Sequence, residues 1–420
     1  MSTDLAVIGL GYVGLPLAQE ACRSGLSVVG IDRSPRVVSG LSSGRSHVDD
    51  LSDDDVNEMM RRGFRATDEA SAIAEASTVV ICVPTPLSPE GGPDLSAVLA
   101  ATDSVAQHVR AGTLVVLEST THPGTTEELL RPRLEAGGLR VGHDLFLAFS
   151  PERIDPGNDR YTFRTTPKVV GGCTPACADR AQAFYGRLVD EVVRARGTRE
   201  AEMAKLLENT YRHVNIALVN EMARFCHELG IDLWDVIRCA STKPFGFQAF
   251  RPGPGVGGHC IPIDPNYLSA RVRSELGYAF RFVELAQEIN NGMPEYVARR
   301  VQDLLNDAGR AVRGSDVLML GVTYKRDISD QRESPAVPLA RKLLAAGAEL
   351  SYHDPYVPLW RVGDRELSSV TDLDAALARA DVTVLIQDHS SYDLDTIAKT
   401  ARRVLDTRGR LVDSPTVEHL

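Results

Sequence analysis

A glycine turn near the start of the chain constrains the fold more than any other feature. The apolar run Leu5–Gly9 leads into the turn Gly9–Gly14, and a helical pattern of apolar residues then extends over Gly14–Gly25. A second apolar run, Ser27–Ile31, follows and ends in Asp32. This order predicts a strand, a helix and a second, parallel strand, which is the opening unit of a doubly wound α/β domain.

The spacing of the three glycines also predicts a dinucleotide-binding site. Gly9 and Gly11 permit a tight turn and a close approach to a pyrophosphate, and the helix that starts at Gly14 directs its N-terminus toward the phosphates. Asp32 lies where a carboxylate accepts hydrogen bonds from the adenosine ribose, which favours NAD over NADP, although the bases Arg33 and Arg36 follow it. The glycine pattern alone is often only a tight turn. The candidate cofactor residues of this unit are Gly9, Gly11, Tyr12, Val13, Gly14, Asp32 and Arg36.

Apolar runs and helical patterns divide the rest of the chain into three parts. The first part continues with predicted strands at Thr78–Val83, Thr113–Leu117, Leu145–Phe149, Val169–Gly171 and Val189–Val193, and reads as a parallel sheet with helices on its faces. The second part has predicted helices from Thr198 to near Gly230 and over Leu276–Gly292, and we expect Met203, Leu207 and Leu218 to be buried there. The third part returns to alternation, with strands at Asp316–Val322, Leu350–His353, Val382–Ile386 and Arg403–Leu405 and a helix at Pro335–Ala346.

The predicted fold class is therefore α/β, with two doubly wound Rossmann-like domains joined by a helical middle domain. We expect the first domain over residues 1–196, the middle domain over 197–308 and the last over 309–420. A chain of 420 residues is too long for one hydrophobic core, which agrees with several domains.

The composition of the chain argues against several classes of binding partner. The net charge of −11 disfavours nucleic acid, because phosphate binding needs a basic face. The chain has no apolar run long enough to cross a membrane, and its start shows no basic region followed by a cleavage site, so we expect a cytoplasmic protein without a membrane partner. Its 7 cysteines are scattered, which predicts neither a disulfide framework nor a metal site.

A cysteine set among glycines and prolines is the strongest candidate for chemistry. In Pro252–Pro265, which reads PGPGVGGHCIPIDP, Cys260 is followed four residues later by Asp264. Such a thiol is either a nucleophile or a small buried hydrophobic residue, and the loop alone leaves both open. Asp264 either helps to place a water or caps a helix. His259 is adjacent to the thiol, and adjacent side chains tend to point apart, so we do not expect it to be the base.

Four further segments carry candidate residues. Lys205 and Asn209 share one face of the long helix, which is either a solvated row or a catalytic pair in which an ammonium stabilises an oxyanion and an amide orients a hydroxyl or water. The loops VPTP with Thr85 and STTHPG with Thr120 follow predicted strands, where an open sheet binds its ligand, or are only stiffened turns. Glu152 in SPER could be an acid, a base or an ion-pair partner.

Taken in order, these motifs resemble those of the nucleotide-sugar 6-dehydrogenases. The resemblance covers essentially the whole chain and rests on GLGYVGLPLA, VPTP, STTHPGTT, SPER, AKLLENTYRHVNIALVNE, GPGVGGHCIPIDP and GVTYKRDISDQRESP. It implies an NAD domain, a helical middle that forms a homodimer and a C-terminal domain for a nucleotide-diphosphate sugar. It also implies oxidation of the sugar C6 to an acid with two NAD, through a thiohemiacetal and a thioester on Cys260.

The resemblance also implies roles for single residues. Lys205 would stabilise oxyanions, Asn209 would hold the substrate or oxyanion, and Asp264 with Thr120 would organise water and proton transfer. Glu152 matches the family's acid, but Pro156 stands where glucose-oxidising members have a second acid. Lys325 and Arg408 match bases that hold the nucleotide sugar, and Arg332 matches an arginine that meets the cofactor, whereas each would otherwise read as a surface base. Arg153, Arg251 and Gly257 complete the predicted substrate site, and Thr85 the predicted cofactor site.

The substrate is expected to be UDP-N-acetylglucosamine or UDP-N-acetylmannosamine. GGHCIPIDP and TKPFGF resemble the branch that oxidises these sugars, although Arg251 and Gln248 differ from the residues expected there. UDP-glucose or another nucleotide-glucose is the alternative. Two readings from other classes are a two-electron hydroxyacid dehydrogenase, which needs the glycine turn but no thiol, and a non-catalytic NAD-binding regulator.

Overall fold

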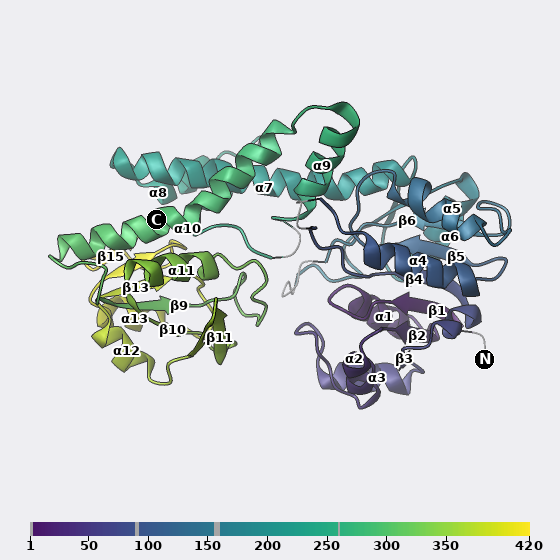
Figure 1. Ribbon diagram of the computed structural model, residues 1–420, viewed down its shortest axis with the longest axis horizontal. Coiled ribbons are helices and arrows are strands. Elements are labelled where there is room, and N and C mark those ends of the chain that lie inside the picture. The colour runs from purple at the N-terminus through teal and green to yellow at the C-terminus, as the bar shows by residue number, and fades with distance from the viewer. Residues whose placement is uncertain (1–2, 89–91, 155–159, 259–260) are drawn as a thin grey trace. The chain divides into compact units, whose positions relative to one another are not determined.

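The computed structural model describes residues 3–88, 92–154, 160–258 and 261–420. The chain forms two compact units. The first unit comprises Met1–Glu208 and Asn266–Tyr278, and the second comprises Asn209–Pro265 and Ala279–Leu420. Each unit has its own sheet and its own core, and each is described by itself (Figure 1).

An eight-stranded sheet forms the centre of the first unit, in the order β3-β2-β1-β4-β5-β6-β7-β8. Neighbouring strands are parallel except for the antiparallel pair β6–β7. In β1, Leu5 pairs with Val28 of β2 and with Thr78 of β4. The strands are β1 (Thr3–Ile8), β2 (Val28–Ile31), β3 (Arg65–Thr67), β4 (Ala76–Ile81), β5 (Leu114–Leu117), β6 (Phe146–Phe149), β7 (Lys168–Gly172) and β8 (Val192–Arg194).

Helices cover both faces of this sheet and bury two apolar clusters against it. One cluster joins the strands to α1 (Gly14–Arg23), α3 (Asp53–Arg61) and α6 (Pro175–Tyr185). The other joins them to η1 (Ala70–Glu75), α4 (Ser96–His108), η2 (Thr126–Leu130) and α5 (Arg131–Glu135). The short helix α2 (Pro35–Ser42) follows β2. Sandwiching a parallel sheet between helices leaves its strands buried on both sides, as their continuous apolar runs require.

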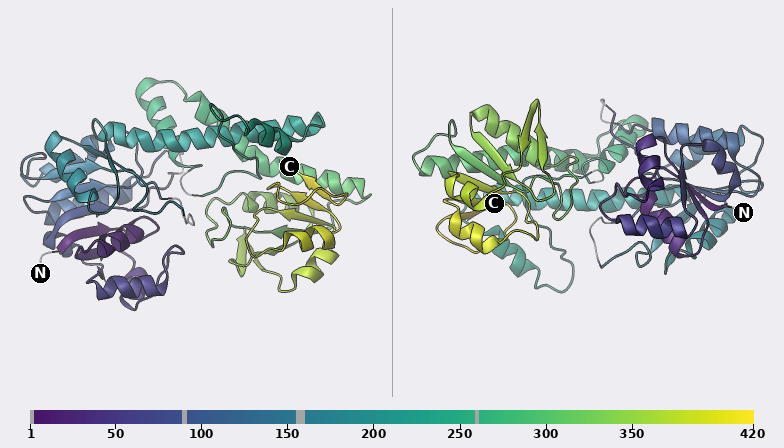
Figure 2. Two further views of the ribbon diagram at one scale, coloured as in Figure 1. Left: turned by 180° about the vertical axis from the view of Figure 1, so that it is seen from behind. Right: turned by 90° about the horizontal axis from the view of Figure 1, so that it is seen from below.

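A five-stranded parallel sheet, in the order β10-β9-β13-β14-β15, forms the centre of the second unit. Its strands are β9 (Asp316–Leu320), β10 (Glu349–His353), β13 (Val382–Leu385), β14 (Val404–Asp406) and β15 (Val417–His419). The helices α10 (Arg281–Asp307) and α11 (Ala336–Ala346) bury one face, and α12 (Leu373–Arg379) and α13 (Leu394–Thr400) bury the other (Figure 2). A separate antiparallel hairpin pairs β11 (Leu359–Val362) with β12 (Arg365–Ser368).

The long helix α7 (Thr198–Glu228) corrects one expectation about burial. Met203, Leu207 and Leu218 are 39%, 62% and 54% exposed, whereas we expected them to be buried. The apolar residues that α7 does bury include Leu206, Ala217 and Val219. The apolar pattern along this helix does not specify which of its apolar residues face a core within this chain.

The predicted helix over Leu276–Gly292 is divided differently in the structure. The first helix, α9 (Asp264–Leu276), ends before Gly277, whose φ of 74° is the left-handed conformation typical of the residue after a helix. Helix α10 then begins at Arg281 and continues past Pro294, which lies inside it. The short helix α8 (Leu233–Ala240) was not predicted. Among the described residues, no helix is both long enough and apolar enough to cross a membrane.

Candidate active site

The glycine turn between β1 and α1 divides its three glycines between two tasks. Gly9 has a φ of 91°, and a Cβ atom there would lie 2.7 Å from the carbonyl oxygen of Cys82. A Cβ atom at Gly14 would lie 1.9 Å from the carbonyl oxygen of Gly9. Both positions therefore need glycine for packing within the protein. At Gly11, by contrast, a Cβ atom would meet nothing within 4 Å, so this exposed glycine leaves room for a ligand.

Asp32 fixes this turn from the end of β2. One carboxylate oxygen accepts a hydrogen bond of 2.9 Å from the backbone N–H of Leu10, and the other accepts one of 2.9 Å from Ser34. The carboxylate is half-buried, and Arg36 lies exposed in the first turn of α2. Tyr12 donates a hydrogen bond to Asp49 at 3.3 Å. An open glycine, a helix N-terminus and an oriented acid are the features that a dinucleotide requires, so these residues fit NAD.

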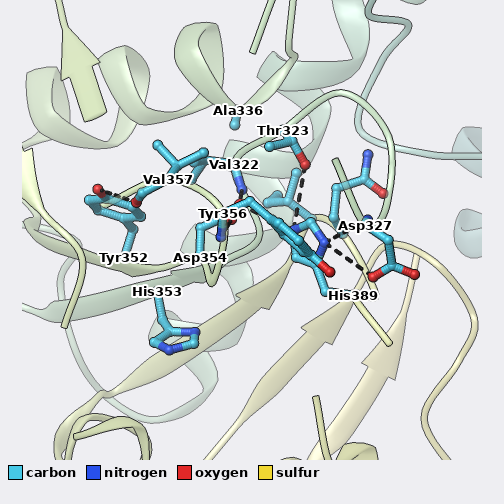
Figure 3. A network of polar contacts seen from close by, with 12 residues as sticks. Val322, Thr323, Asp327, Ala336, Tyr352, His353, Asp354, Tyr356, Val357 and His389 are labelled. Atoms are coloured by element: carbon cyan, nitrogen blue, oxygen red, sulfur yellow. Dashed lines mark hydrogen bonds and ion pairs between the residues drawn. The ribbon is translucent and has the colours of Figure 1, made fainter. Parts of the chain in front are cut away.

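The sheet of the second unit has a similar glycine turn after its first strand. This second turn does not offer the same open space for a ligand. Gly321 follows β9 with a φ of 74°, and Asp354 follows β10 and accepts a hydrogen bond of 2.7 Å from the backbone N–H of Val322. Here, however, the buried ring of His389 also contacts Asp354, at 3.2 Å (Figure 3). The backbone N–H of Asp327 donates to the Nδ1 atom of His389, so Nε2 carries the proton toward Asp354. The acid of this second turn is thus already bonded within the protein.

Two loops beside the glycine turn carry the other cofactor candidates. Thr85 is buried, and its carbonyl oxygen accepts a hydrogen bond from Tyr267. Thr120 is half-buried in the loop after β5. The buried carboxylate of Glu202 in α7 accepts hydrogen bonds from the backbone N–H groups of Gly124, at 2.6 Å, and Thr126, at 2.9 Å. This carboxylate ties the loop of Thr120 to the helix that carries Lys205.

Lys205 and Glu152 meet in the first unit, through the main chain of Glu152. Lys205 is 8% exposed as a residue, and its ammonium donates a hydrogen bond of 2.5 Å to the carbonyl oxygen of Glu152. The Glu152 carboxylate accepts hydrogen bonds from the backbone N–H groups of Arg153 and Ile154 and from Lys168, the last at 3.1 Å. This geometry favours the ion-pair reading of Glu152. Arg153 forms an ion pair of 2.7 Å with Glu208.

Asn209 and Asp264 meet in the second unit. The side-chain amide of Asn209 donates a hydrogen bond of 2.5 Å to the Asp264 carboxylate, and both side chains are buried. Asp264 is also the first residue of α9. Asp264 therefore stands at a helix start and is paired with Asn209, and its role in placing a water stays a prediction. Neither Lys205 nor Asn209 belongs to a solvated row.

The glycines that precede Cys260 pack against loops from the C-terminal part of the chain. A Cβ atom at Gly257 would lie 2.6 Å from the side chain of Tyr324, and one at Gly253 would lie 3.2 Å from the guanidinium of Arg408. The backbone N–H of Gly258 donates a hydrogen bond of 3.0 Å to the carbonyl oxygen of Arg332. The segment thus needs glycine in order to lie this close to the predicted substrate bases.

These bases are held by neighbouring main chain and acids. The Arg408 guanidinium donates to the carbonyl oxygen of Ile386 at 2.6 Å, and its backbone N–H donates to Asp406 at 2.7 Å. Arg332 is exposed and forms an ion pair of 2.6 Å with Asp330. Lys325 is half-buried in the same loop, and Arg251 is exposed. Cys260, His259 and Pro156 lie outside the described residues.

Comparison with known proteins decides the family. Three family models cover most of the chain: the NAD binding domain of the UDP-glucose/GDP-mannose dehydrogenase family matches residues 3–189, its central domain 199–292 and its UDP binding domain 318–414. The chain belongs to this family. Membership confirms the predictions of an NAD-dependent nucleotide-sugar dehydrogenase with NAD as its cofactor, and it sets aside the two readings without nucleotide-sugar oxidation.

Individual members of the family align over nearly the whole chain. UDP-N-acetyl-D-mannosamine dehydrogenase of Salmonella typhi is 35% identical over 97% of this chain and 99% of its own length. NDP-N-acetyl-D-galactosaminuronic acid dehydrogenase of Ralstonia nicotianae is 35% identical over 96% of this chain and 95% of its own. The solved structure of UDP-D-ManNAc dehydrogenase from Pyrococcus horikoshii is 33% identical, with a TM-score of 0.90 over 99% of this chain and 98% of its own. The predicted α/β fold class is confirmed.

Sequence reasoning missed three groups of buried polar residues near the candidate site. Glu118 follows β5 directly and precedes the loop of Thr120, so its position at a strand end was the available signal. Lys168 stands at the first position of β7, where a lysine in an apolar run was the signal. Asn220 and Asn290 lie in two helices, 70 residues apart, and no sequence pattern connects them.

Proposed function

We propose that this chain oxidises C6 of a UDP-N-acetylhexosamine to the uronic acid in two steps, with Cys260 as the covalent nucleophile. The C6 alcohol loses a hydride and a proton and becomes an aldehyde, and the Cys260 thiolate adds to the aldehyde carbon. Loss of a second hydride gives a thioester, and water then releases the acid and restores the thiol. NAD supplies the hydride acceptor for each oxidation. The thiohemiacetal on Cys260 retains the aldehyde between the two oxidations, and the thioester retains the acyl group until water releases it.

The observation that carries the proposal is the packing of the glycines before Cys260. Gly253, Gly257 and Gly258 lie against Arg408, Tyr324 and the main chain of Arg332, so the segment that leads to the thiol touches the loops that carry the substrate bases. A guanidinium suits diphosphate recognition because it presents a fixed fork of N–H donors. This arrangement supports a nucleotide-diphosphate sugar whose C6 reaches Cys260.

The remaining roles follow from the chemistry of the proposed steps. Lys205 stabilises the oxyanions that form when the thiol and the water add to the carbonyl carbon. Asn209 orients the substrate hydroxyl or oxyanion, and Asp264, to which it is hydrogen bonded, takes part with Thr120 in placing the water and moving protons. Arg153, Arg251, Gly257 and Lys325 complete the proposed substrate site, and Thr85 and Arg332 the proposed cofactor site.

For the sugar we propose N-acetylmannosamine or N-acetylglucosamine. Names of relatives that are 35% identical over almost the full chain, which specify N-acetylhexosamine derivatives, support this class. A nucleotide-glucose is the alternative. Gln248 and Arg251, which differ from the residues expected in this branch, are exposed, and Gln248 accepts a hydrogen bond of 3.1 Å from Tyr211.

A panel of UDP-N-acetylmannosamine, UDP-N-acetylglucosamine, UDP-glucose and GDP-mannose, assayed for NADH and for uronic acid, tests the proposal. We expect two NADH per sugar consumed, and an N-acetylhexosamine as the substrate with the highest kcat/KM. Cys260→Ser should bind NAD and the nucleotide sugar but release no acid. Cys239→Ser, the same substitution at an exposed cysteine, is the matched control and should keep full turnover. A yield of one NADH, or full turnover by Cys260→Ser, would overturn the proposal.

Three further features accompany this proposal. We propose a homodimer, supported by the exposed side chains of Leu207, Tyr211, Leu218 and Phe225 along α7, which a partner helix would cover. We retain the three domains 1–196, 197–308 and 309–420 as functional divisions. We also retain a cytoplasmic location, with which the free thiols of the 6 described cysteines agree. Analytical ultracentrifugation of Leu218→Glu tests the proposed dimer. We expect this variant to sediment as a monomer.

A further inference from the structure

A buried cluster of charged side chains lies next to Lys205 in the first unit. The Lys168 ammonium contacts Glu118 at 3.2 Å and Glu152 at 3.1 Å, and the three side chains are 5%, 0% and 9% exposed. Glu118 also accepts a hydrogen bond from Tyr185, while its Oε2 atom has no hydrogen-bond partner among the described residues. The titratable groups that face one another here are Cys82 after β4, Glu118 after β5, Glu152 after β6, Lys168 in β7, Tyr185 in α6 and Lys205 in α7.

Burying three ionisable groups has a desolvation cost that can exceed the energy gained from their ion pairs. Replacement of a buried ion pair by apolar residues is often neutral or stabilising, so a stability role alone is weak grounds for such a cluster. The cluster is connected to one proposed catalytic group. The carboxylate of Glu152 accepts a hydrogen bond from Lys168, and its main-chain carbonyl oxygen accepts one from Lys205.

The Glu152 carboxylate determines where that carbonyl lies. It accepts hydrogen bonds from the backbone N–H groups of Arg153 and Ile154, so it folds the turn that follows its own residue. Lys168 holds the same carboxylate from the neighbouring strand β7, and Glu118 holds Lys168 from the other side. The connection runs in order from Glu118 to Lys168, then to Glu152 and Lys205.

We propose that Lys168, held by Glu118, is a positioning residue for Lys205 and acts through the carboxylate and the main-chain carbonyl of Glu152. Glu152 then contributes by orienting the ammonium and not by transferring a proton. This proposal rests on the proposed function only in assigning a catalytic role to Lys205. Orientation matters for that role, because an oxyanion is stabilised by a donor already aimed at its position.

The protonation states of the cluster agree with this role. Burial acts to raise the pKa of Glu152, but the charge of Lys168 and the hydrogen bond from Ile154 bring the pKa below its ordinary value, so the carboxylate is ionised. Burial acts to lower the pKa of Lys168, and the two carboxylates outweigh it and raise the pKa. Burial raises the pKa of Glu118 to about 7 in spite of Lys168.

The test compares Lys168→Met, which removes the charge and keeps the length, with Lys168→Arg, which keeps the charge. Lys342→Met is the matched control, because Lys342 of α11 lies exposed in an ion pair with Glu295 of α10. Reductive methylation by formaldehyde and a borane, followed by peptide mass spectrometry, reports the accessibility of the Lys205 amine without any need for turnover. We expect Lys205 to be modified several-fold faster in Lys168→Met than in the wild type, in Lys168→Arg or in the control.

Activity gives a second readout, with an N-acetylhexosamine substrate from the panel. We expect kcat to fall about 10- to 100-fold in Lys168→Met, with the KM for NAD unchanged, since small displacements of a catalytic group cost factors of this size. The acidic limb of the kcat profile should move to higher pH, because the charge that lowers the pKa of Glu152 is gone. Lys168→Arg should restore both.

Several outcomes would overturn the proposal. A folded Lys168→Met that binds NAD normally and shows wild-type methylation of Lys205 excludes positioning, whatever the substrate proves to be. A lower kcat with an unmoved acidic limb and no rescue by arginine indicates a packing role only. If Lys168→Met does not fold, Glu118→Gln, which keeps the shape of the side chain, takes its place, and wild-type methylation and pH profile in that variant reject the proposal. Absence of NADH formation by the wild type rejects the proposed function and leaves the methylation test decisive.

Discussion

Asn209 donates a hydrogen bond of 2.5 Å from its amide to the carboxylate of Asp264, and both side chains are buried. The pair connects α7 to the first residue of α9, directly after the cysteine loop. Removing a donor from a buried carboxylate lowers the stability of the folded protein, because water cannot reach the carboxylate to replace the lost hydrogen bond. The pair is thus structural as well as catalytic in the proposed mechanism, and the two contributions can be measured separately.

Asn209→Leu should lower the free energy of unfolding by about 1–3 kcal/mol, because it removes one donor from a buried carboxylate. Urea unfolding followed by circular dichroism measures this change. Asn215→Leu, which removes an amide that donates to the carbonyl oxygen of Tyr211 on the same helix, is the control and should change stability by less. Equal losses in the two variants would contradict the role given to the Asp264 hydrogen bond.

Two glycine substitutions should separate folding from cofactor binding. Gly14→Ala places a Cβ atom 1.9 Å from the Gly9 carbonyl oxygen, so we expect a lower melting temperature. Gly11→Ala meets no protein atom within 4 Å, so we expect a wild-type melting temperature without ligand and a weaker affinity for NAD, by about tenfold or more. Thermal unfolding and calorimetric titration with NAD provide the measurements. Unchanged NAD affinity in Gly11→Ala would show that the pyrophosphate does not approach this glycine.

The glycine segment before Cys260 is held by two buried amides. Asn220 accepts a hydrogen bond of 2.9 Å from the backbone N–H of Gly253 and donates one of 2.9 Å to Asn290. Asn220→Leu should therefore increase hydrogen exchange in the peptide that contains Gly253, and should lower kcat while the affinity for NAD stays unchanged. Mass spectrometry of exchange and a steady-state assay provide the data, with Asn215→Leu again as the control. Wild-type exchange at Gly253 would mean that the amide pair does not hold the segment.

His213 predicts a pH dependence of stability. Burial lowers the pKa of His213 to about 4, below its ordinary value of 6.5, so the folded protein keeps the ring neutral while the unfolded chain takes up a proton. Stability from this residue is complete above pH 6.5 and is lost as the pH falls toward 4. Between about pH 7.5 and about pH 5 the wild type should lose about 2 kcal/mol more than His213→Gln, as urea unfolding at each pH would show. Equal losses in the two proteins would contradict a buried, neutral His213.

Much of the first unit could be predicted because its information is local. The run from Leu5 through the glycine turn to Asp32 encodes strand, turn, helix and strand over adjacent residues, and the structure has these elements within a few residues of the predicted limits. The carboxyl ends of parallel strands share one edge of the sheet, so the loops of Thr85, Thr120 and Glu152 were correctly expected to follow strands.

The parts that could not be predicted depend on distant contacts. Lys168 and Glu118 are 50 residues apart in sequence, and only the order of the strands brings them together. The exposure of Leu207 depends on which side of α7 faces a core, which its apolar pattern does not specify. The helix expected to end at Gly292 continues as α10 to Asp307, with Pro294 buried inside it.

The contact between His389 and Asp354 bears on when the cofactor is exchanged during the proposed reaction. In the described part of the chain, the turn at Gly11 combines an open glycine with an acid whose oxygens accept hydrogen bonds from backbone N–H groups, and we expect the two proposed oxidations to use this dinucleotide site in succession. Reduced cofactor must depart and a fresh molecule must arrive while the half-oxidised sugar stays on the enzyme. The rate of that exchange then sets the minimum lifetime that the proposed bond to Cys260 must have.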